Sequence, residues 1–276
     1  MSVRVTRTVE KTLLSRIAAA PSVFCFLDYD GTLSPLAPTP MEAVALPGTS
    51  AIVRRLAAAP AVQVALVSGR PIADVRRFLD VPGIYYVGTH GLEVRRPSGD
   101  VEVAEGIASV RTVLPEIQQR LQAILGSRPG VLMEDKGAAL AYHYRLAAPA
   151  DAVAVRKAIS AVAHDYQRRG VPITLVYGHE VAELRPASCD KGKAACALLA
   201  RHARSALPVY IGDDRSDEDA FEMLPRESIT IRVAPPRTPT HARYRVREPR
   251  DVQRFLRQML QARAGHWPPD GPRRVH

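Results

Sequence analysis

The stretch FLDYDGTLSP, Phe26 to Pro35, decides the predicted fold because an apolar run passes directly into two aspartates. Residues 22–27 form a short, continuous apolar segment, which is typical of a strand buried on both faces of a parallel sheet. Asp28 and Asp30 follow, and carboxylates so close in space repel each other. A cation or a catalytic role usually offsets that repulsion, so the end of this strand is the first candidate site.

Buried strands alternate with helices on both sides of a central segment. Before that segment, the pattern predicts helices over 3–20, 49–59 and 72–79, and strands over 62–67 and 83–87. After it, the pattern predicts helices over 191–203, 217–224 and 250–262, and strands over 208–211 and 228–233. This order is the signature of an α/β fold with a doubly wound, Rossmann-like parallel sheet.

The central segment has a different order, helix, hairpin, helix, hairpin, which predicts a small α+β layer with one face of an antiparallel sheet covered. We therefore expect a discontinuous catalytic core over 1–105 and 188–264, with an α+β cap inserted over 106–187. The remaining tail, 265–276, is rich in Pro and Gly and is expected to be disordered.

The composition excludes several function classes. The net charge is +10, but the positive residues are mostly arginines scattered along the chain, without a zinc-finger, basic-zipper or RNP-like pattern. We therefore predict no nucleic-acid partner, although a positive surface attracts anionic small molecules. No apolar run is long enough to span a membrane, and no leader peptide is expected. The three cysteines are too few for a disulfide framework, which favours a cytoplasmic protein.

Three predicted strands end in polar loops, LDYDGT, VSGR and IGDD. Ligands of open parallel sheets bind at the carboxyl ends of the strands, so these loops should converge. Convergence would bring Asp28, Asp30, Ser68, Asp213 and Asp214 together. Hard oxygen ligands without His or Cys indicate Mg²⁺, which commonly works beside phosphate. The sequence therefore predicts a phosphoryl-transfer site.

The residue types assign roles at that site. Asp28, at the strand end, is the candidate nucleophile toward phosphorus, and Asp30 would protonate the leaving oxygen and then activate water. Thr32 can hydrogen-bond a phosphate oxygen. Lys191, which opens a helix in SCDKGKA, would neutralise the phosphoryl oxygens together with the hydroxyl of Ser68.

With DYDGT, the strand ending in Ser68, the Lys191 helix start and GDDRSDEDAF, the chain resembles haloacid dehalogenase-type phosphatases. The resemblance implies the same roles for Asp28 and Asp30, and phosphoryl binding by Ser68 and Lys191. It also implies a Mg²⁺ ion held by Asp28, the backbone carbonyl of Asp30 and Asp213. Two further aspartates, Asp214 and Asp217, would support the metal from behind.

Each motif alone has a simpler interpretation. A single DxDGT can be an acidic surface turn, GDD can be a helix cap, and Lys191 can be a solvated lysine. An EF-hand starting at Asp28 fails, because Leu33 stands where glycine is required and Thr39 where a bidentate glutamate is required. The phosphatase prediction depends on all the motifs occurring in the right order.

The predicted cap is polar where its strands should face the site. Four charged residues there, Glu134, Lys136, Arg145 and Glu183, can hydrogen-bond sugar hydroxyls. Cross-strand ion pairs on a solvated sheet face would give the same pattern, and the residue types alone leave both interpretations open.

The motifs GTHGLEV, EDKG with HYR, VAELRP with DKG, and VAPPRTPTHARYRV are similar to those of trehalose-6-phosphate phosphatases, over about 24–256. The resemblance implies that the four cap residues grip trehalose and that His90 and Glu93 line the core–cap junction. We also assign Gly69 and Arg70 of the VSGR loop to substrate binding. Arg215, Ser216 and the pair His179-Glu180 depart from the family pattern, and the latter could alter a substrate contact.

Two alternatives remain at this point. The chain could act on another sugar phosphate, such as sucrose 6-phosphate or glucosylglycerol phosphate, or it could be a non-catalytic phosphosugar sensor. Because the nucleophile and metal carboxylates are all present, we expect an enzyme. The expected partner is trehalose 6-phosphate, and we expect a monomer that acts without a synthase domain.

Overall fold

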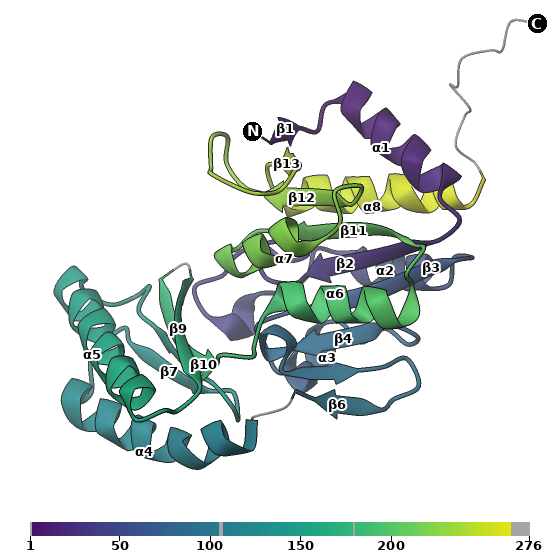
Figure 1. Cartoon of the computed structure of the whole chain (residues 1–276). Helices are drawn as coiled ribbons and strands as arrows, with labels where there is room; N and C mark the ends of the chain where they lie inside the picture. Colours follow the sequence, from purple (N-terminus) through teal and green to yellow (C-terminus); the bar gives the residue numbers. More distant parts are fainter. Residues whose placement is uncertain (1, 105–106, 179, 266–276) are drawn as a thin grey trace, which may run out of the picture.

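The computed structural model describes residues 2–104, 107–178 and 180–265, and it has an α/β fold with two separate sheets. One sheet is large and mostly parallel, and the other is small and antiparallel, so the predicted fold class is confirmed (Figure 1). The predicted tail lies outside the described residues, apart from Gly265. The expected boundaries between core and cap stay a prediction.

The large sheet has nine strands among the described residues. In spatial order they are β1 (Val3–Arg4), β13 (Tyr244–Val246), β12 (Ile229–Val233), β11 (Leu207–Gly212), β2 (Val23–Asp28), β3 (Val62–Val67), β4 (Tyr85–Gly88), β5 (Glu93–Arg95) and β6 (Val101–Val103). The pairs from β1 to β4 are parallel, whereas β5 and β6 are antiparallel. The parallel strands therefore end along one edge of the sheet.

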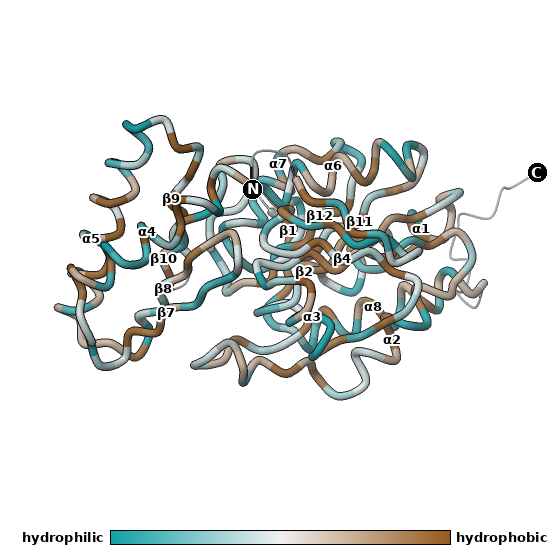
Figure 2. The backbone as a smooth tube through the Cα atoms, turned by 90° about the horizontal axis from the view of Figure 1, so that it is seen from below, coloured by the Kyte–Doolittle hydropathy of each residue, from teal (hydrophilic) through white to brown (hydrophobic). Residues whose placement is uncertain are grey.

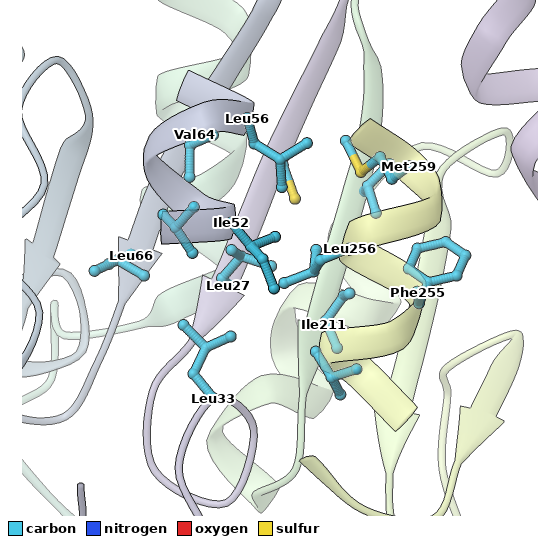
Figure 3. Packing of buried hydrophobic residues seen from close by; sticks show 14 of the residues in the cluster. Leu27, Leu33, Ile52, Leu56, Val64, Leu66, Ile211, Phe255, Leu256 and Met259 are labelled. Carbon is cyan, nitrogen blue, oxygen red and sulfur yellow. The ribbon is translucent and has the colours of Figure 1, made fainter. Parts of the chain in front are cut away.

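Helices cover both faces of this sheet. Figure 2 shows α6 (Lys191–His202) and α7 (Glu218–Met223) on one side and α2 (Thr49–Ala57), α3 (Ile72–Phe78) and α8 (Pro249–Arg263) on the other. Side chains alternate along each strand, so Phe24 and Phe26 pack toward α6 and α7, whereas Cys25 and Leu27 pack toward α2 and α8. Figure 3 shows the apolar cluster between the sheet and the helices α2 and α8, which contains Leu27.

The small sheet has the order β7 (Leu132–Asp135), β8 (Leu140–His143), β10 (Val181–Pro186) and β9 (Ile173–Gly178). Two long helices, α4 (Ile107–Leu125) and α5 (Pro149–Arg168), pack on its outer face and share a separate apolar cluster with it. Figure 1 shows this layer beside the edge where β2 ends. The uncovered face of the small sheet is thereby available to form one side of a cavity.

The prediction was wrong at two strands. Residues 3–20 were expected to form one helix, but Val3 and Arg4 form β1, and α1 (Arg7–Ala19) begins after the N-cap residue Thr6. The strand β13 was not predicted. The two strands pair in parallel, with Val3 opposite Tyr244, so β1 depends on a partner about 240 residues away, whereas β13 also pairs with β12. Local sequence patterns do not carry such a pairing.

Among the described residues, no helix has both the length and the apolar character that crossing a bilayer requires.

Candidate active site

A cavity of about 180 Å³ lies between the carboxyl edge of the large sheet and the uncovered face of the small sheet. The described residues that line it include most of the predicted site: Asp28, Asp30, Gly69, Arg70, His90, Glu134, Lys136, Arg145, Glu183, Lys191, Asp213 and Asp214. Four predicted residues, Thr32, Ser68, Glu93 and Asp217, are not among the lining residues. Strand ends far apart in the sequence therefore meet as expected, but not every predicted side chain reaches the cavity.

The floor consists of Asp28, Asp213 and Lys191, which line the cavity, and of Asp217, which lies buried beneath them. Asp28 ends β2, and Lys191 is the first residue of α6, whose N-cap Asp190 accepts a hydrogen bond from the backbone N–H of Lys193. Nζ of Lys191 lies 2.7 Å from Oδ1 of Asp28 and 2.9 Å from Oδ1 of Asp217. All three side chains are buried, so one lysine joins two carboxylates in a low-dielectric environment.

The pKa values of the floor reflect its excess of carboxylates. The pKa of Asp28 is raised to about 7, chiefly by burial, with Lys191 opposing the shift and Asp217 adding to it. The pKa of Asp213 is also raised well above its usual value, first by burial and then by Asp28 and Asp217. Burial lowers the pKa of Lys191, but the two carboxylates that it contacts more than offset this, so that pKa is raised. A cation bound here would relieve the repulsion among the carboxylates.

Oxygen atoms of Asp28, Asp213 and Asp217 lie within 4.8 Å of one another, which fits a hard divalent cation. The sequence had placed Asp217 behind the metal. Its carboxylate accepts hydrogen bonds from the hydroxyl of Tyr210 and from the backbone N–H groups of Asp213 and Asp214, so it also holds the loop after β11 in place. The predicted use of the Asp30 carbonyl stays a prediction.

The turn after β2 must pass very close to Asp213. Gly31 has a φ of +76°, and a Cβ atom there would lie 2.1 Å from Oδ2 of Asp213. Thr32 is fully buried, and its hydroxyl lies 3.4 Å from Oδ1 of Asp213. The hydroxyl of Thr32 thus supports the floor, and its contact with a phosphate oxygen stays a prediction.

Arg70 binds Asp30 rather than lying free in the cavity. Its Nε and Nη2 donate to the two carboxylate oxygens of Asp30 at 2.7 and 2.5 Å, and its guanidinium group stacks over the ring of Phe78. The hydroxyl of Ser68 accepts the backbone N–H of Arg70. This ion pair holds the candidate acid–base group at the rim of the floor.

The cavity wall is formed by Glu134, Lys136, His143 and Glu183 of the small sheet, together with His90 of the core. Lys136 Nζ lies 2.5 Å from Oε2 of Glu183, His90 Nε2 lies 3.1 Å from Oε1 of Glu183, and His143 Nε2 lies 2.8 Å from Oε2 of Glu134. The wall thus contains cross-strand ion pairs, which were one of the two interpretations that the sequence allowed. These pairs face the cavity rather than solvent.

Burial sets the charge states of the central wall residues. It lowers the pKa of His90 to about 4 against the opposing effect of Glu183, so the imidazole is neutral at pH 7. Burial favours the neutral form of Glu183 and so raises its pKa, but the contacts with Lys136 and His90 outweigh this effect. The pKa of Glu183 is therefore held well below its usual value. Gly69 leaves room for this arrangement, since a Cβ atom there would lie 2.6 Å from Nε2 of His90.

Two predicted substrate residues have other contacts. Arg145 donates to the backbone carbonyl of Ala37 in the loop after β2 and lies 3.3 Å from a carboxylate oxygen of Glu180. Oε1 of Glu93 accepts the backbone N–H of Ile72 at 2.6 Å. Arg145 therefore joins the small sheet to the core, and Glu93 orients α3. His179, one of the expected departures, lies outside the described residues.

Sequence reasoning missed His143 and the loop over 36–39, all of which line the cavity. The signal for His143 was present, because it belongs to the HYR motif and shares a strand face with Ala141 and Arg145 in the period-two pattern of a strand. No comparable signal marked the loop, whose position follows from the Arg145–Ala37 contact.

The fold, together with the carboxylates and the lysine of the floor, is that of phosphatase-like proteins with the haloacid dehalogenase fold. Comparisons with known proteins narrow this class of proteins to one family. The trehalose-phosphatase family model matches residues 26–250. The chain therefore belongs to the trehalose-phosphatase family. It is 38% identical over 222 residues to the trehalose-phosphate phosphatase of Mycobacterium tuberculosis strain H37Rv. The aligned stretch covers 79% of this chain and 54% of that protein. The chain thus spans about half the length of the curated relatives that it matches.

Solved structures agree with this placement. The C-terminal domain of Candida albicans trehalose-6-phosphate phosphatase superposes with a TM-score of 0.82 at 20% identity, over 94% of this chain and 98% of that domain. Trehalose-6-phosphate phosphatase from Aspergillus fumigatus superposes with a TM-score of 0.68 at 25% identity, over 95% of this chain and 100% of that one. The first of these likenesses concerns the fold alone.

Proposed function

We propose that this chain hydrolyses trehalose 6-phosphate to trehalose and phosphate with Mg²⁺, through an aspartyl-phosphate on Asp28. The observation that carries the proposal is the meeting, in one cavity, of a floor suited to a phosphoryl group and a wall suited to a sugar. Membership of the trehalose-phosphatase family supports the choice of substrate.

The floor supplies the chemistry of the first step. A carboxylate oxygen of Asp28 attacks phosphorus, the bond between phosphorus and the sugar oxygen breaks, and Asp30 gives the leaving oxygen a proton. Lys191 stabilises the negative charge that spreads over the phosphoryl oxygens. Asp28 and Asp213, with Asp217 beside them, would hold Mg²⁺, which supplies further charge neutralisation when bound.

In the second step, Asp30 takes a proton from a water molecule, whose oxygen attacks phosphorus and breaks the bond to Asp28. Arg70 holds both carboxylate oxygens of Asp30 in this structure, so the pair must loosen for Asp30 to reach the leaving oxygen. The floor can then return to its starting state with free phosphate released.

The wall supplies selectivity. Glu183, Lys136 and Glu134 present charged donors and acceptors that are already oriented by their mutual contacts, and such groups read sugar hydroxyls with little loss of entropy on binding. We infer that the small sheet, within the segment 106–187, acts as a cap that closes the cavity and excludes water. Arg145 would help to hold it against the loop at Ala37.

The experiment that tests this function is phosphate release from trehalose 6-phosphate with Mg²⁺, with sucrose 6-phosphate, glucose 6-phosphate and p-nitrophenyl phosphate in parallel. EDTA and the Asp28→Asn variant are the controls. Preferred hydrolysis of trehalose 6-phosphate, lost in both controls, is expected. Activity toward p-nitrophenyl phosphate alone would retain the role of the floor and refute that of the wall.

Two other outcomes of the same assay correspond to the alternatives. Preference for sucrose 6-phosphate, or for glucosylglycerol phosphate when it is added to the same set of substrates, would mean the same chemistry with different sugar contacts. No turnover by folded protein that still binds the sugar phosphate would indicate a sensor. We further propose that the chain acts as a cytoplasmic monomer, which light scattering and cell fractionation can test.

A further inference from the structure

A second pocket, of about 250 Å³, lies at the end of the large sheet where β12, β13 and β1 finish. Its lining shares no residue with the cavity between the two sheets. Four of the described residues that line it are arginines: Arg4, Arg237, Arg245 and Arg247. Figure 1 shows β1, β12 and β13 together, away from the small sheet's helices. The pocket is therefore a separate feature of the carboxyl edge, where ligands of such sheets bind.

The surroundings of this pocket are cationic in sequence as well as in space. Residues 228–247 contain five arginines and no aspartate or glutamate. The carboxylates that follow, Glu248 and Asp251, are not among the lining residues, and Asp251 accepts the backbone N–H of Arg247. Positive charges thus converge on one hollow with no carboxylate in its lining, and mutual repulsion among them favours an anionic ligand.

Hydrogen bonds fix the loop that carries Arg237. Oε2 of Glu218 accepts the backbone N–H of His241 at 2.7 Å and the hydroxyl of Thr240 at 3.2 Å, while Oε1 accepts Nη1 of Arg232 at 2.6 Å. Arg237 itself has a φ of +71°, a backbone conformation that costs free energy in a residue with a Cβ atom. The loop therefore holds an arginine at the pocket in a strained position instead of leaving it on a mobile segment.

Two hydrogen bonds likewise orient the guanidinium group of Arg245. Its Nε donates to the hydroxyl of Ser2 at 2.7 Å, and its Nη2 donates to the carbonyl of Thr238 at 3.3 Å. Apart from Ser2, the remaining lining is apolar, from Ala234, Pro236 and Val246. An oriented guanidinium group matches the geometry of a phosphate group, which accepts two parallel hydrogen bonds.

We propose that this pocket binds a phosphate group, carried either by inorganic phosphate or by an organic phosphate ester. Arginine is the residue best suited to such recognition because its charge is permanent and its donors form a rigid fork. The apolar lining leaves space for the organic part of an ester. This site is separate from the proposed hydrolytic site, and its existence does not depend on the phosphatase activity.

The test is isothermal titration calorimetry of the full chain with inorganic phosphate, AMP and adenosine, in low-salt buffer with EDTA. Without a divalent cation, the carboxylates of the floor repel anions, so the arginine pocket is the expected binding site. The variant Arg237→Ala/Arg247→Ala should lower the affinity at least about 10-fold, since charge-assisted hydrogen bonds are lost. The control variant Arg55→Ala/Arg111→Ala changes the net charge equally, at exposed arginines outside the pocket, and should bind normally.

The ligands distinguish the two sources of the phosphate. Tighter binding of AMP than of inorganic phosphate, with adenosine inactive, identifies an ester, and the reverse order identifies free phosphate. Equal losses in both variants would refute the proposal in favour of diffuse surface charge. Unchanged affinity in the pocket variant, or no binding to the wild-type chain, would also refute it. If thermal melts show that the alanine pair is destabilised, the Arg237→Gln/Arg247→Gln pair, which keeps most of each side chain, replaces it.

Discussion

The floor and the wall of the cavity are both built from buried charged groups, but they balance charge differently. In the floor, Asp28 and Asp217 share one lysine, and Asp213 lies beside them. In the wall, Glu183 and Glu134 each have a nitrogen partner, at 2.5 and 2.8 Å. The floor thus has an unfilled requirement for positive charge, whereas each of these two wall carboxylates has a nitrogen partner of its own. From this difference we infer that a cation would stabilise the floor, and the proposed role of the wall is to bind a neutral ligand.

The largest effect is expected when Lys191 is removed from the floor. In Lys191→Met, Asp28 and Asp217 keep their burial but lose their shared cation, and breaking a buried pair in this way costs about 3–5 kcal/mol. Urea unfolding in EDTA measures the change, and activity should fall below detection. Lys193→Met is the matched control, because Lys193 is exposed on the same helix. If the midpoint urea concentration of Lys191→Met equals that of the wild-type chain, Lys191 does not offset repulsion between the carboxylates, and the floor has no charge imbalance.

The second effect concerns the cation itself. Mg²⁺ at about 100 times its dissociation constant should raise the free energy of unfolding by about 2.7 kcal/mol, because it binds the folded chain. Thermal melts with Mg²⁺ and with EDTA measure this, and the shift should vanish in Asp213→Asn. The wall variant Glu134→Gln should retain the full shift. A loss of the shift in the wall variant as well would mean that floor and wall are not independent.

The third effect separates the wall from the floor in catalysis. Glu183→Gln keeps the size of the side chain but weakens its contact with Lys136 and the contact that we propose with the sugar. We expect kcat/KM for trehalose 6-phosphate to fall about 30-fold, equivalent to about 2 kcal/mol. Hydrolysis of p-nitrophenyl phosphate, which has no sugar, should be unchanged. A parallel loss with both substrates would assign Glu183 to the floor's chemistry.

Part of the fold and of the site could be predicted from the sequence. The bounds of β3 were predicted without error, and the meeting of Asp28, Asp30 and Asp213 followed from the rule that parallel strands end along one edge. These features depend on local patterns and on strand order. The roles proposed for these residues in catalysis stay predictions.

The sequence could not show which way side chains turn after they reach the site. The Arg70–Asp30 pair, the capping of α3 by Glu93 and the contact of Arg145 with Ala37 each depend on side-chain direction across elements far apart in the chain. The strand β1 depends in the same way on its pairing with β13. Residue types and spacing set which groups gather, and tertiary packing decides which of them touch the cavity.

The smallest expected effect is the contribution of His90, in the wall, to the pH dependence of the free energy of unfolding. Burial lowers the pKa of His90 to about 4 in the folded chain, whereas an unfolded histidine has a pKa of about 6.5. Between these values, the unfolded chain binds a proton that the folded chain does not, so stability falls as the pH falls. Glu183 opposes this shift, and Arg185 and Lys191 reinforce it. From pH 6 to pH 5, His90 should cost about 1 kcal/mol of folding free energy.

His90→Asn is the variant that isolates this contribution. Asparagine tolerates the left-handed backbone of His90, which has a φ of 55°, and it does not titrate. Urea unfolding at both pH values should show a decline for the variant that is smaller by about 1 kcal/mol than for the wild-type chain. An equal decline would mean that His90 is protonated in the folded wall, with Glu183 as its counter-ion. The wall would then carry a net charge that changes with pH, and its preorganisation for a neutral sugar would hold only over part of the pH range.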